Sequence, residues 1–180
     1  MIMFAKSSVL SGVITVIALI PSAPALAQFG GFFGGGPEIE IVDTATLSKM
    51  LTEQRKSEAK ATQTGGAKPT PNFVVVDVRS DAEVGVSIIP GAITKNEFEK
   101  NRQAYAGRLV IPYCTVGGRS GTYAKQLAKE GVEVKNYKGS ILKWVDAGLP
   151  LVTLEGKSTN RVHTYSDRYR IPSKYEQVTR

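Results

Sequence analysis

Residues 108–130 read RLVIPYCTVGGRSGTYAKQLAKE, and this stretch decides both the fold and the candidate chemistry. Its first seven residues are mostly apolar, which predicts a buried strand that ends at Cys114. Thr115, Val116 and two glycines follow, and residues 119–130 then show the apolar spacing of a helix. A strand that passes through a tight loop directly into a helix is a building unit of α/β folds.

Strands and helices alternate outward from this unit. The β-branched run FVVVDV at residues 73–78 is typical of a strand buried on both faces. Further strands are expected at residues 39–42 and 132–137. Helices are expected at residues 47–56, 80–86 (one turn), 97–105, 119–130 and 140–148. Asp43 or Thr44 is expected to cap the first of them. In the helix at 119–130, Tyr123, Leu127 and Ala128 are expected to point inward. The order predicts an α/β domain of three layers, with a mainly parallel central sheet flanked by helices. Residues 57–72 are expected to form a long surface loop.

The loop CTVGGRS, residues 114–120, is the candidate anion site. It lies at the carboxyl end of a predicted parallel strand, where ligands bind in open α/β sheets. Backbone N–H groups of such a loop converge on one point, and the following helix adds the positive end of its dipole. A cysteine at that point has its thiolate favoured, which lowers its pKa. The residues expected around the anion are Thr115, Val116, Gly117, Gly118, Arg119 and Ser120, with Arg119 supplying a fixed charge for an oxyanion.

Composition favours a packed domain that handles small anions. Hydrophobic residues make up 42% and charged residues 22% of the 180 residues, values close to globular averages. The net charge is +7, but no long run of Lys and Arg and no basic stripe with interleaved aromatics occurs. These patterns argue against nucleic-acid binding and favour a positive field that attracts small anions.

The chain contains one cysteine, so no internal disulfide can form. In an oxidising compartment a lone thiol indicates either pairing with another chain or reactivity. A buried cysteine can also serve as a small hydrophobic residue. The loop that follows Cys114 favours reactivity.

The N-terminus predicts export. One lysine, an apolar stretch and Ala25-Leu26-Ala27 match a signal peptide over residues 1–27, cleaved before Gln28. A Gly-rich linker is expected at residues 28–38. The bacterial periplasm is the default compartment, and a thylakoid lumen is the alternative. An uncleaved membrane anchor is the competing interpretation, and contact with a membrane is expected only in that case.

The C-terminal segment, residues 153–180, is basic and contains three tyrosines but no periodic apolar face. Such a composition favours a tail without fixed structure. Wrapping around the domain, or docking to a protein partner, stays open.

Four landmarks in order carry a family resemblance. They are Asp77-Val78-Arg79, Pro90-Gly91-Ala92, the pattern Cys-x-x-Gly-x-Arg-Ser from Cys114 to Ser120, and Gly139 followed by Trp144, Gly148 and Pro150. With them, residues 39–152 resemble a single-domain rhodanese-like protein of the thiosulfate sulfurtransferase family. The resemblance implies a rhodanese-like α/β domain and a transferase activity that needs neither a cofactor nor a metal.

The resemblance also implies a reaction in two steps. Cys114 would attack the outer sulfur of a small anionic donor such as thiosulfate, release sulfite and become a persulfide. The loop residues 115–120 would hold the persulfide, and Arg119 would help to bind the donor. A thiol or cyanide would then accept the sulfur. Since the chain has no second cysteine, the acceptor must come from outside.

Some positions depart from the family pattern. Ser87-Ile88 stand where Gly-His is common, and Gly139-Ser140 replaces a frequent Gly-Gly. Asp77 and Arg79 are expected to support the strand end as an ion pair, and Trp144 is expected in the core. His163 is the only histidine and lies in the C-terminal segment, so neither a Cys/His pair nor a metal site is expected.

Two other functions compete with sulfur transfer. Phosphatases and arsenate reductases of the cysteine-loop type show Cys-x5-Arg, commonly after a His, whereas four residues separate Cys114 from Arg119 and Tyr113 comes before. The shorter loop suits a sulfur atom better than a phosphate. A non-catalytic binding or scaffold module is the second alternative, because a fold alone does not fix a function.

Overall fold

The computed structural model describes residues 36–179. The expected signal peptide at residues 1–27 and most of the expected linker at residues 28–38 lie outside this range. No helix within residues 36–179 is long and apolar enough to cross a membrane.

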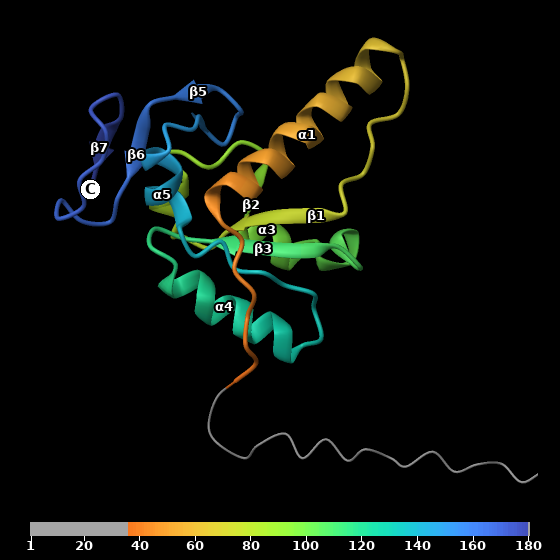
Figure 1. The fold of residues 1–180 in the computed structure, drawn as a ribbon, viewed down its shortest axis with the longest axis horizontal. Helices are drawn as coiled ribbons and strands as arrows, with labels where there is room; N and C mark the ends of the chain where they lie inside the picture. The colour runs from red at the N-terminus through yellow and green to blue at the C-terminus, as the bar shows by residue number, and fades with distance from the viewer. Residues whose placement is uncertain (1–35, 180) are drawn as a thin grey trace, which may run out of the picture. The chain divides into compact units, whose positions relative to one another are not determined.

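A parallel sheet forms the centre of the domain (Figure 1). The strands β1 (Phe73–Asp77), β2 (Ala92–Thr94) and β3 (Leu109–Tyr113) are arranged in the order β2-β1-β3, and both pairings are parallel. Isolated parallel bridges join Val110 to Val134 and Ile41 to Asn136, so the two outer segments continue the sheet in short contacts. The strands expected at residues 39–42 and 132–137 are therefore reduced to bridges.

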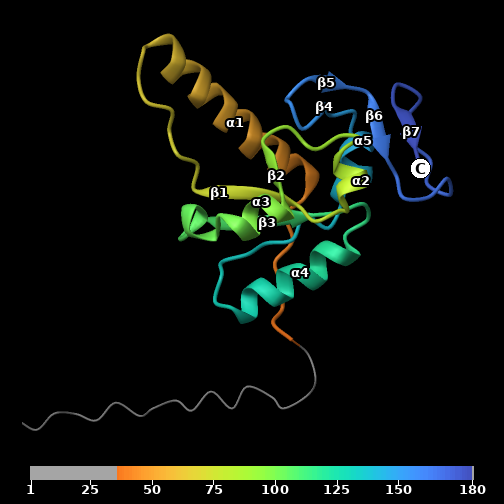
Figure 2. The same cartoon turned by 180° about the vertical axis from the view of Figure 1, so that it is seen from behind.

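Helices cover both faces of the sheet, as the views from the two sides show (Figures 1 and 2). On one face, α1 (Thr44–Gln63) and α5 (Ser140–Asp146) pack on the odd-numbered residues of β1, with Leu47 and Trp144 fully buried. On the other face, α3 (Lys95–Lys100) and α4 (Gly118–Lys129) pack on the even-numbered residues. The predicted α/β architecture of three layers is confirmed, and so is the place of Trp144 in the core.

Some predicted boundaries are wrong. α1 continues to Gln63, so only residues 64–72 form the loop that was expected over 57–72. The extension has a simple cause, because SEAKATQ consists largely of helix-compatible residues and the first glycine follows at Gly65. The helix at residues 97–105 is divided into α3 and a 3-10 turn, Arg102–Tyr105, and the helical turn at residues 80–86 is the short α2 (Asp81–Val84). In α4, Ala124 rather than Ala128 is fully buried.

The C-terminal segment folds onto the domain, which contradicts the expectation of a tail without fixed structure. It forms the strands β5 (Ser158–Thr159), β6 (Arg161–His163) and β7 (Glu176–Val178), and β5 pairs with β4 (Leu151–Val152), which directly precedes the segment. β6 and β7 pair in parallel, and Val162 and Thr164 are fully buried. Arg79 reaches this segment, because its Nη1 donates to the carbonyl of His163 at 3.5 Å. The segment is part of the domain because its few apolar side chains pack in the core.

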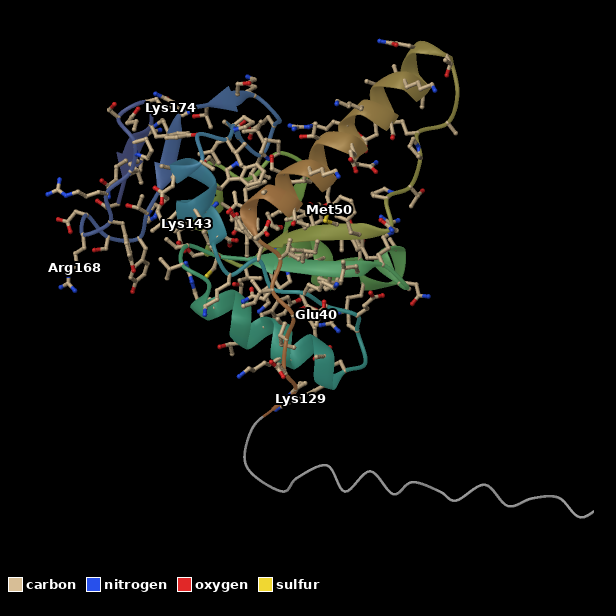
Figure 3. All side chains as sticks on the ribbon, viewed as in Figure 1. Glu40, Met50, Lys129, Lys143, Arg168 and Lys174 are labelled. Carbon is tan, nitrogen blue, oxygen red and sulfur yellow. The ribbon has the colours of Figure 1, made fainter. Side chains whose placement is uncertain are left out.

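The basic side chains lie mainly at the periphery. Figure 3 shows Lys143, Arg168 and Lys174 extending outward, and all three residues are exposed. Met50, by contrast, packs against the core beneath α1. These three charged side chains therefore lie at the surface of the domain.

Candidate active site

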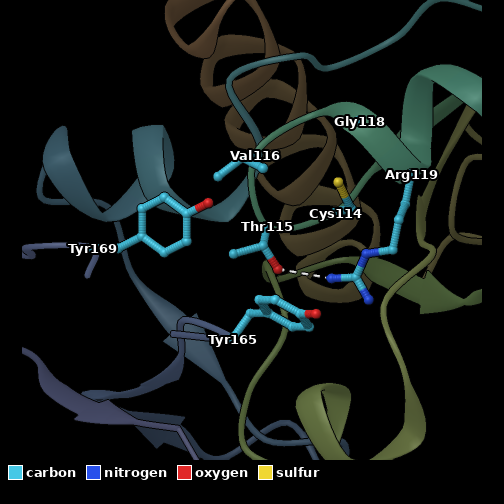
Figure 4. A pocket seen from close by; sticks show the side chains of 7 residues that line it. All are labelled: Cys114, Thr115, Val116, Gly118, Arg119, Tyr165 and Tyr169. Carbon is cyan, nitrogen blue, oxygen red and sulfur yellow. Dashed lines mark hydrogen bonds between the residues drawn. The ribbon is translucent and has the colours of Figure 1, made fainter. Parts of the chain in front are cut away.

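Cys114 directly follows β3 at the carboxyl edge of the parallel sheet. Its side chain is 1% exposed, yet it lines a pocket of about 280 Å³ (Figure 4). The sulfur is therefore shielded from bulk water but reachable from one side. The structure describes no other cysteine, and the sequence contains none.

Backbone amides of the loop converge on the sulfur. The N–H of Gly117 donates to Cys114 Sγ at 3.1 Å. Burial raises the pKa of Cys114, but hydrogen bonds from the backbone N–H groups of Ser120, Val116 and Gly117 outweigh it, and the net pKa lies below the ordinary thiol value. The amides of the loop are thus directed at the cysteine, and the binding of an anion by them stays a prediction.

Gly117 makes this loop possible. Its φ of 92° lies in the left-handed region, and a Cβ atom there would lie 2.3 Å from the carbonyl oxygen of Lys138. Neither condition allows a side chain. Gly118, the first residue of α4, has open space where a Cβ would stand, so the two adjacent glycines are not equivalent.

Ser140, the first residue of α5, supports the cysteine. Its hydroxyl accepts the N–H of Cys114 at 3.0 Å and lies 3.9 Å from Cys114 Sγ. Ser140 has a φ of 56°, which is unusual for a residue with a side chain. A glycine would take this conformation without strain, so the serine that replaces the frequent second glycine gives the Cys114 amide an acceptor at a cost in backbone strain.

Arg119 is already paired. Its Nη1 and Nη2 donate to the carboxylate of Glu83, each at 2.7 Å, and Nη2 also lies 2.9 Å from Thr115 Oγ1. The Thr115 hydroxyl donates to the same carboxylate at 2.9 Å. Burial alone would raise the pKa of Glu83, but its hydrogen bonds with Arg119, Ser80 and Thr115 lower it to about 2. The expected fixed positive charge is thus half of an ion pair rather than a free cation.

Asp77 and Arg79 form the expected supporting ion pair. Arg79 Nε and Nη2 donate to the Asp77 carboxylate at 2.9 and 2.7 Å, and both side chains are fully buried. Neither residue lines the pocket at Cys114. The pair therefore fixes the end of β1 and the chain around it.

Two tyrosines of the C-terminal segment complete the pocket. Tyr165 and Tyr169 stand opposite the cysteine loop in Figure 4, and the guanidinium of Arg119 lies 5.8 Å from the centre of the Tyr165 ring. The residues that line the pocket are Cys114, Thr115, Val116, Gly118, Arg119, Tyr165 and Tyr169. Among the predicted site residues, Gly117 and Ser120 act through their amides instead of lining it.

His163 has a structural contact and does not line the pocket. Its Nδ1 accepts the backbone N–H of Tyr165 at 3.1 Å. Within residues 36–179, no group of three or more His, Cys, Asp and Glu side chains is placed to hold a metal ion.

The chain matches the Rhodanese-like domain family over residues 58–147, half of its length. It belongs to the rhodanese-like family. A relative named sulfurtransferase, from Allochromatium vinosum, is 33% identical over 128 residues, which cover 66% of this chain and 99% of the relative. This membership supports a sulfurtransferase type of function.

Other similarities are partial. The tRNA uridine(34) hydroxylase of Bordetella pertussis is 29% identical over 115 residues, but the match covers 43% of that protein. A crystal structure of a thiosulfate sulfurtransferase from Pseudomonas aeruginosa has a TM-score of 0.51 at 20% identity, covering 68% of this chain and 21% of that one. The latter likeness shows the rhodanese-like fold alone.

Sequence reasoning missed four residues of this rhodanese-like site, which are Glu83, Ser140, Tyr165 and Tyr169. Glu83 lies in a short polar turn, and nothing in its neighbourhood indicates that it reaches Arg119. Tyr165 and Tyr169 lie in the segment that was expected to lack structure. The local signal for Glu83 is the motif Ser80-x-x-Glu83, which predicts a capping box at the start of α2. This motif places the Glu83 carboxylate near Ser80.

Proposed function

We propose that this protein is a sulfurtransferase that moves a sulfane sulfur from a donor such as thiosulfate to a thiophilic acceptor, through a persulfide on Cys114. One observation carries the proposal: backbone amides of the loop are directed at the sulfur of Cys114, and this residue lines a pocket. Amides that stabilise a thiolate also stabilise the terminal anionic sulfur of a persulfide, because both are sulfur anions. The name of the Allochromatium relative supports the same class of reaction.

The first step loads the cysteine. The Cys114 thiolate attacks the outer sulfur of thiosulfate, the sulfur–sulfur bond of the donor breaks, and sulfite leaves with the bonding electron pair. The charge before and after the step is the same, since a thiolate and a dianion become a persulfide anion and a sulfite dianion. The Ser140 hydroxyl holds the backbone of the nucleophile, because it accepts the N–H of Cys114.

The second step needs a partner from outside the chain. A thiolate or cyanide attacks the terminal sulfur of the persulfide, and the Cys114 thiolate leaves. Since the sequence contains one cysteine, no thiol of the same chain can accept the sulfur. The pocket at Cys114 is the route by which the acceptor would reach it.

Intact mass spectrometry after treatment with thiosulfate tests the proposal. We expect a gain of roughly one sulfur mass, about 32 Da, which a reductant reverses and which Cys114→Ser lacks. With cyanide as the acceptor, the wild-type protein should form thiocyanate and the variant should not. Retained folding of Cys114→Ser, checked by circular dichroism, is the control.

The same experiment separates the alternatives. Persulfide formation without turnover in the presence of thiols and cyanide would favour a binding module that carries sulfur. Hydrolysis of an aryl phosphate without any gain of sulfur would favour the phosphatase alternative and overturn the proposal.

A further inference from the structure

The wall of the pocket opposite Cys114 is aromatic and comes from the segment that follows β6. Tyr165 and Tyr169 lie on the connection between β6 and β7, and their rings face the loop of Cys114 and Thr115 (Figure 4). The volume of about 280 Å³ is close to the lower end of the range for pockets that bind organic ligands. Thiosulfate, an inorganic anion of five heavy atoms, has no apolar group that could pack against the two rings.

Hydrogen bonds hold the tyrosine connection in place. Tyr165 has a φ of 65°, a conformation that costs energy in a residue with a side chain, and its N–H donates to His163 Nδ1 at 3.1 Å. The side-chain amide nitrogen of Gln177 lies 2.7 Å from Thr164 Oγ1 and 2.9 Å from the carbonyl oxygen of Tyr169. The backbone that carries the two rings is therefore held by hydrogen bonds, while the Tyr165 side chain stays largely exposed and free to contact a ligand.

Charge at the site favours a donor with one negative charge. Among the residues described as lining the pocket, Arg119 is the single cationic side chain, and Glu83 neutralises it through two hydrogen bonds of 2.7 Å. The loop amides are directed at one sulfur anion. Thiosulfate brings two negative charges toward a thiolate, whereas a donor in which an organic group replaces one oxygen brings one. Repulsion between like charges at short distance in a partly buried site is costly.

We propose that Tyr165 and Tyr169 are specificity-determining residues that select a monoanionic sulfane-sulfur donor with an apolar or aromatic organic group over inorganic thiosulfate. The proposal depends on the proposed persulfide function of Cys114 and names the class of its donor. The organic group would pack on the two rings, and the sulfane sulfur would point to the loop amides.

The chemistry balances for an arylthiosulfonate, which serves as the probe. The Cys114 thiolate attacks the sulfane sulfur, the bond between this sulfur and the sulfonyl sulfur breaks, and an arylsulfinate leaves with the electron pair. Two monoanions react, and two monoanions, the persulfide and the sulfinate, are formed. No oxidant, reductant or proton is required.

The test compares benzenethiosulfonate with thiosulfate, using the rate of persulfide formation at Cys114 followed by intact mass. We expect the wild-type protein to prefer the aryl donor in kcat/KM. Tyr165→Ala combined with Tyr169→Ala should reduce the ratio of kcat/KM for the aryl donor to kcat/KM for thiosulfate by about 10-fold or more. Each aromatic contact that is lost should weaken binding of the aryl group several-fold. The double variant with Phe at both positions keeps the rings and should keep the ratio.

Leu154→Ala is the matched control, because Leu154 is an exposed apolar residue of the same C-terminal segment that does not line the pocket. It should leave the ratio as in the wild type. A ratio unchanged in the folded double Ala variant, or a wild-type preference for thiosulfate, overturns the selection proposal while the persulfide function stands. Failure of both donors to add sulfur to Cys114 overturns both proposals.

Discussion

The hydroxyl of Ser140 accepts the backbone N–H of Cys114 at 3.0 Å, from a residue whose φ is 56°. The nucleophile is thus fixed by a side chain that stands where glycine would be unstrained. A buried N–H without an acceptor costs about 1–3 kcal/mol, and the left-handed conformation costs a residue with a side chain about 1–2 kcal/mol. The protein therefore keeps this hydrogen bond although the backbone of Ser140 is strained.

Substitution of Ser140 separates these two contributions. Ser140→Ala loses the acceptor but keeps the strain, and we expect the free energy of unfolding to fall by about 2 kcal/mol. Ser140→Gly loses the acceptor and the strain together, and it should be more stable than Ser140→Ala by about 1 kcal/mol, the reverse of the usual order. Urea unfolding of the two variants measures the difference. A glycine variant less stable than the alanine variant would show that the strain is absent.

The two glycines after Val116 should respond differently to alanine. Gly117→Ala places a Cβ 2.3 Å from the Lys138 carbonyl and demands a φ of 92°, so we expect a loss of about 3 kcal/mol in stability and no persulfide formation. Gly118→Ala has open space and lies at the start of α4, so its stability should stay close to that of the wild type. Thermal unfolding and intact mass test both. Equal behaviour of the variants would contradict the loop geometry.

Glu83 should make stability depend on acid pH. Its pKa is lowered from 4.5 to about 2 in the folded protein. The ionised carboxylate therefore contributes stability above pH 4.5, and this contribution is lost as the pH falls toward 2. We expect Glu83→Gln to reduce the free energy of unfolding by about 3 kcal/mol at pH 7, and the difference from the wild type should shrink by more than half at pH 3. Urea unfolding at both pH values measures it.

Glu53→Gln is the control for this comparison. Its carboxylate is 63% exposed and pairs with Lys49 at 3.9 Å on the surface of α1. Surface pairs of this kind contribute at most about 1 kcal/mol, so the substitution should be nearly silent at both pH values. A Glu83→Gln effect that stays constant with pH would mean that the ion pair with Arg119 does not carry it.

The reactivity of Cys114 should extend to lower pH than that of an ordinary thiol. Because loop amides lower the pKa of Cys114, the rate of alkylation by iodoacetamide should rise with a midpoint below pH 9.0. Ser120→Ala should move the midpoint upward, since the Ser120 hydroxyl also lowers this pKa. Thr122→Ala, an exposed residue of the same helix, is the control. The single cysteine makes the alkylated product unambiguous.

The parts of the molecule that follow from local patterns could be predicted. β1 and β3 are continuous apolar runs, and Cys114 is followed by glycines that allow the loop to turn, so the sequence indicates where the amides converge. Burial of Trp144 follows from its place in a short apolar helix. These features depend on residues close together in the chain.

The missed features depend on contacts between distant residues. Glu83 and Arg119 meet because α2 and the start of α4 lie at the same edge of the sheet, which no local pattern encodes. The C-terminal segment has too few apolar residues to show a period, yet Val162 is fully buried and Gln177 fixes the chain by hydrogen bonds to Thr164 and Tyr169. A polar composition therefore concealed an ordered part of the site.

The aromatic wall lies C-terminal to the rest of the site, so a ribosome makes it later. A polypeptide is synthesised from its N-terminus at about 5–20 residues per second. β1, β3 and the cysteine loop are complete well before the segment with Tyr165 and Tyr169 emerges. During synthesis, the proposed nucleophile therefore leaves the ribosome before the two residues that we propose select its donor.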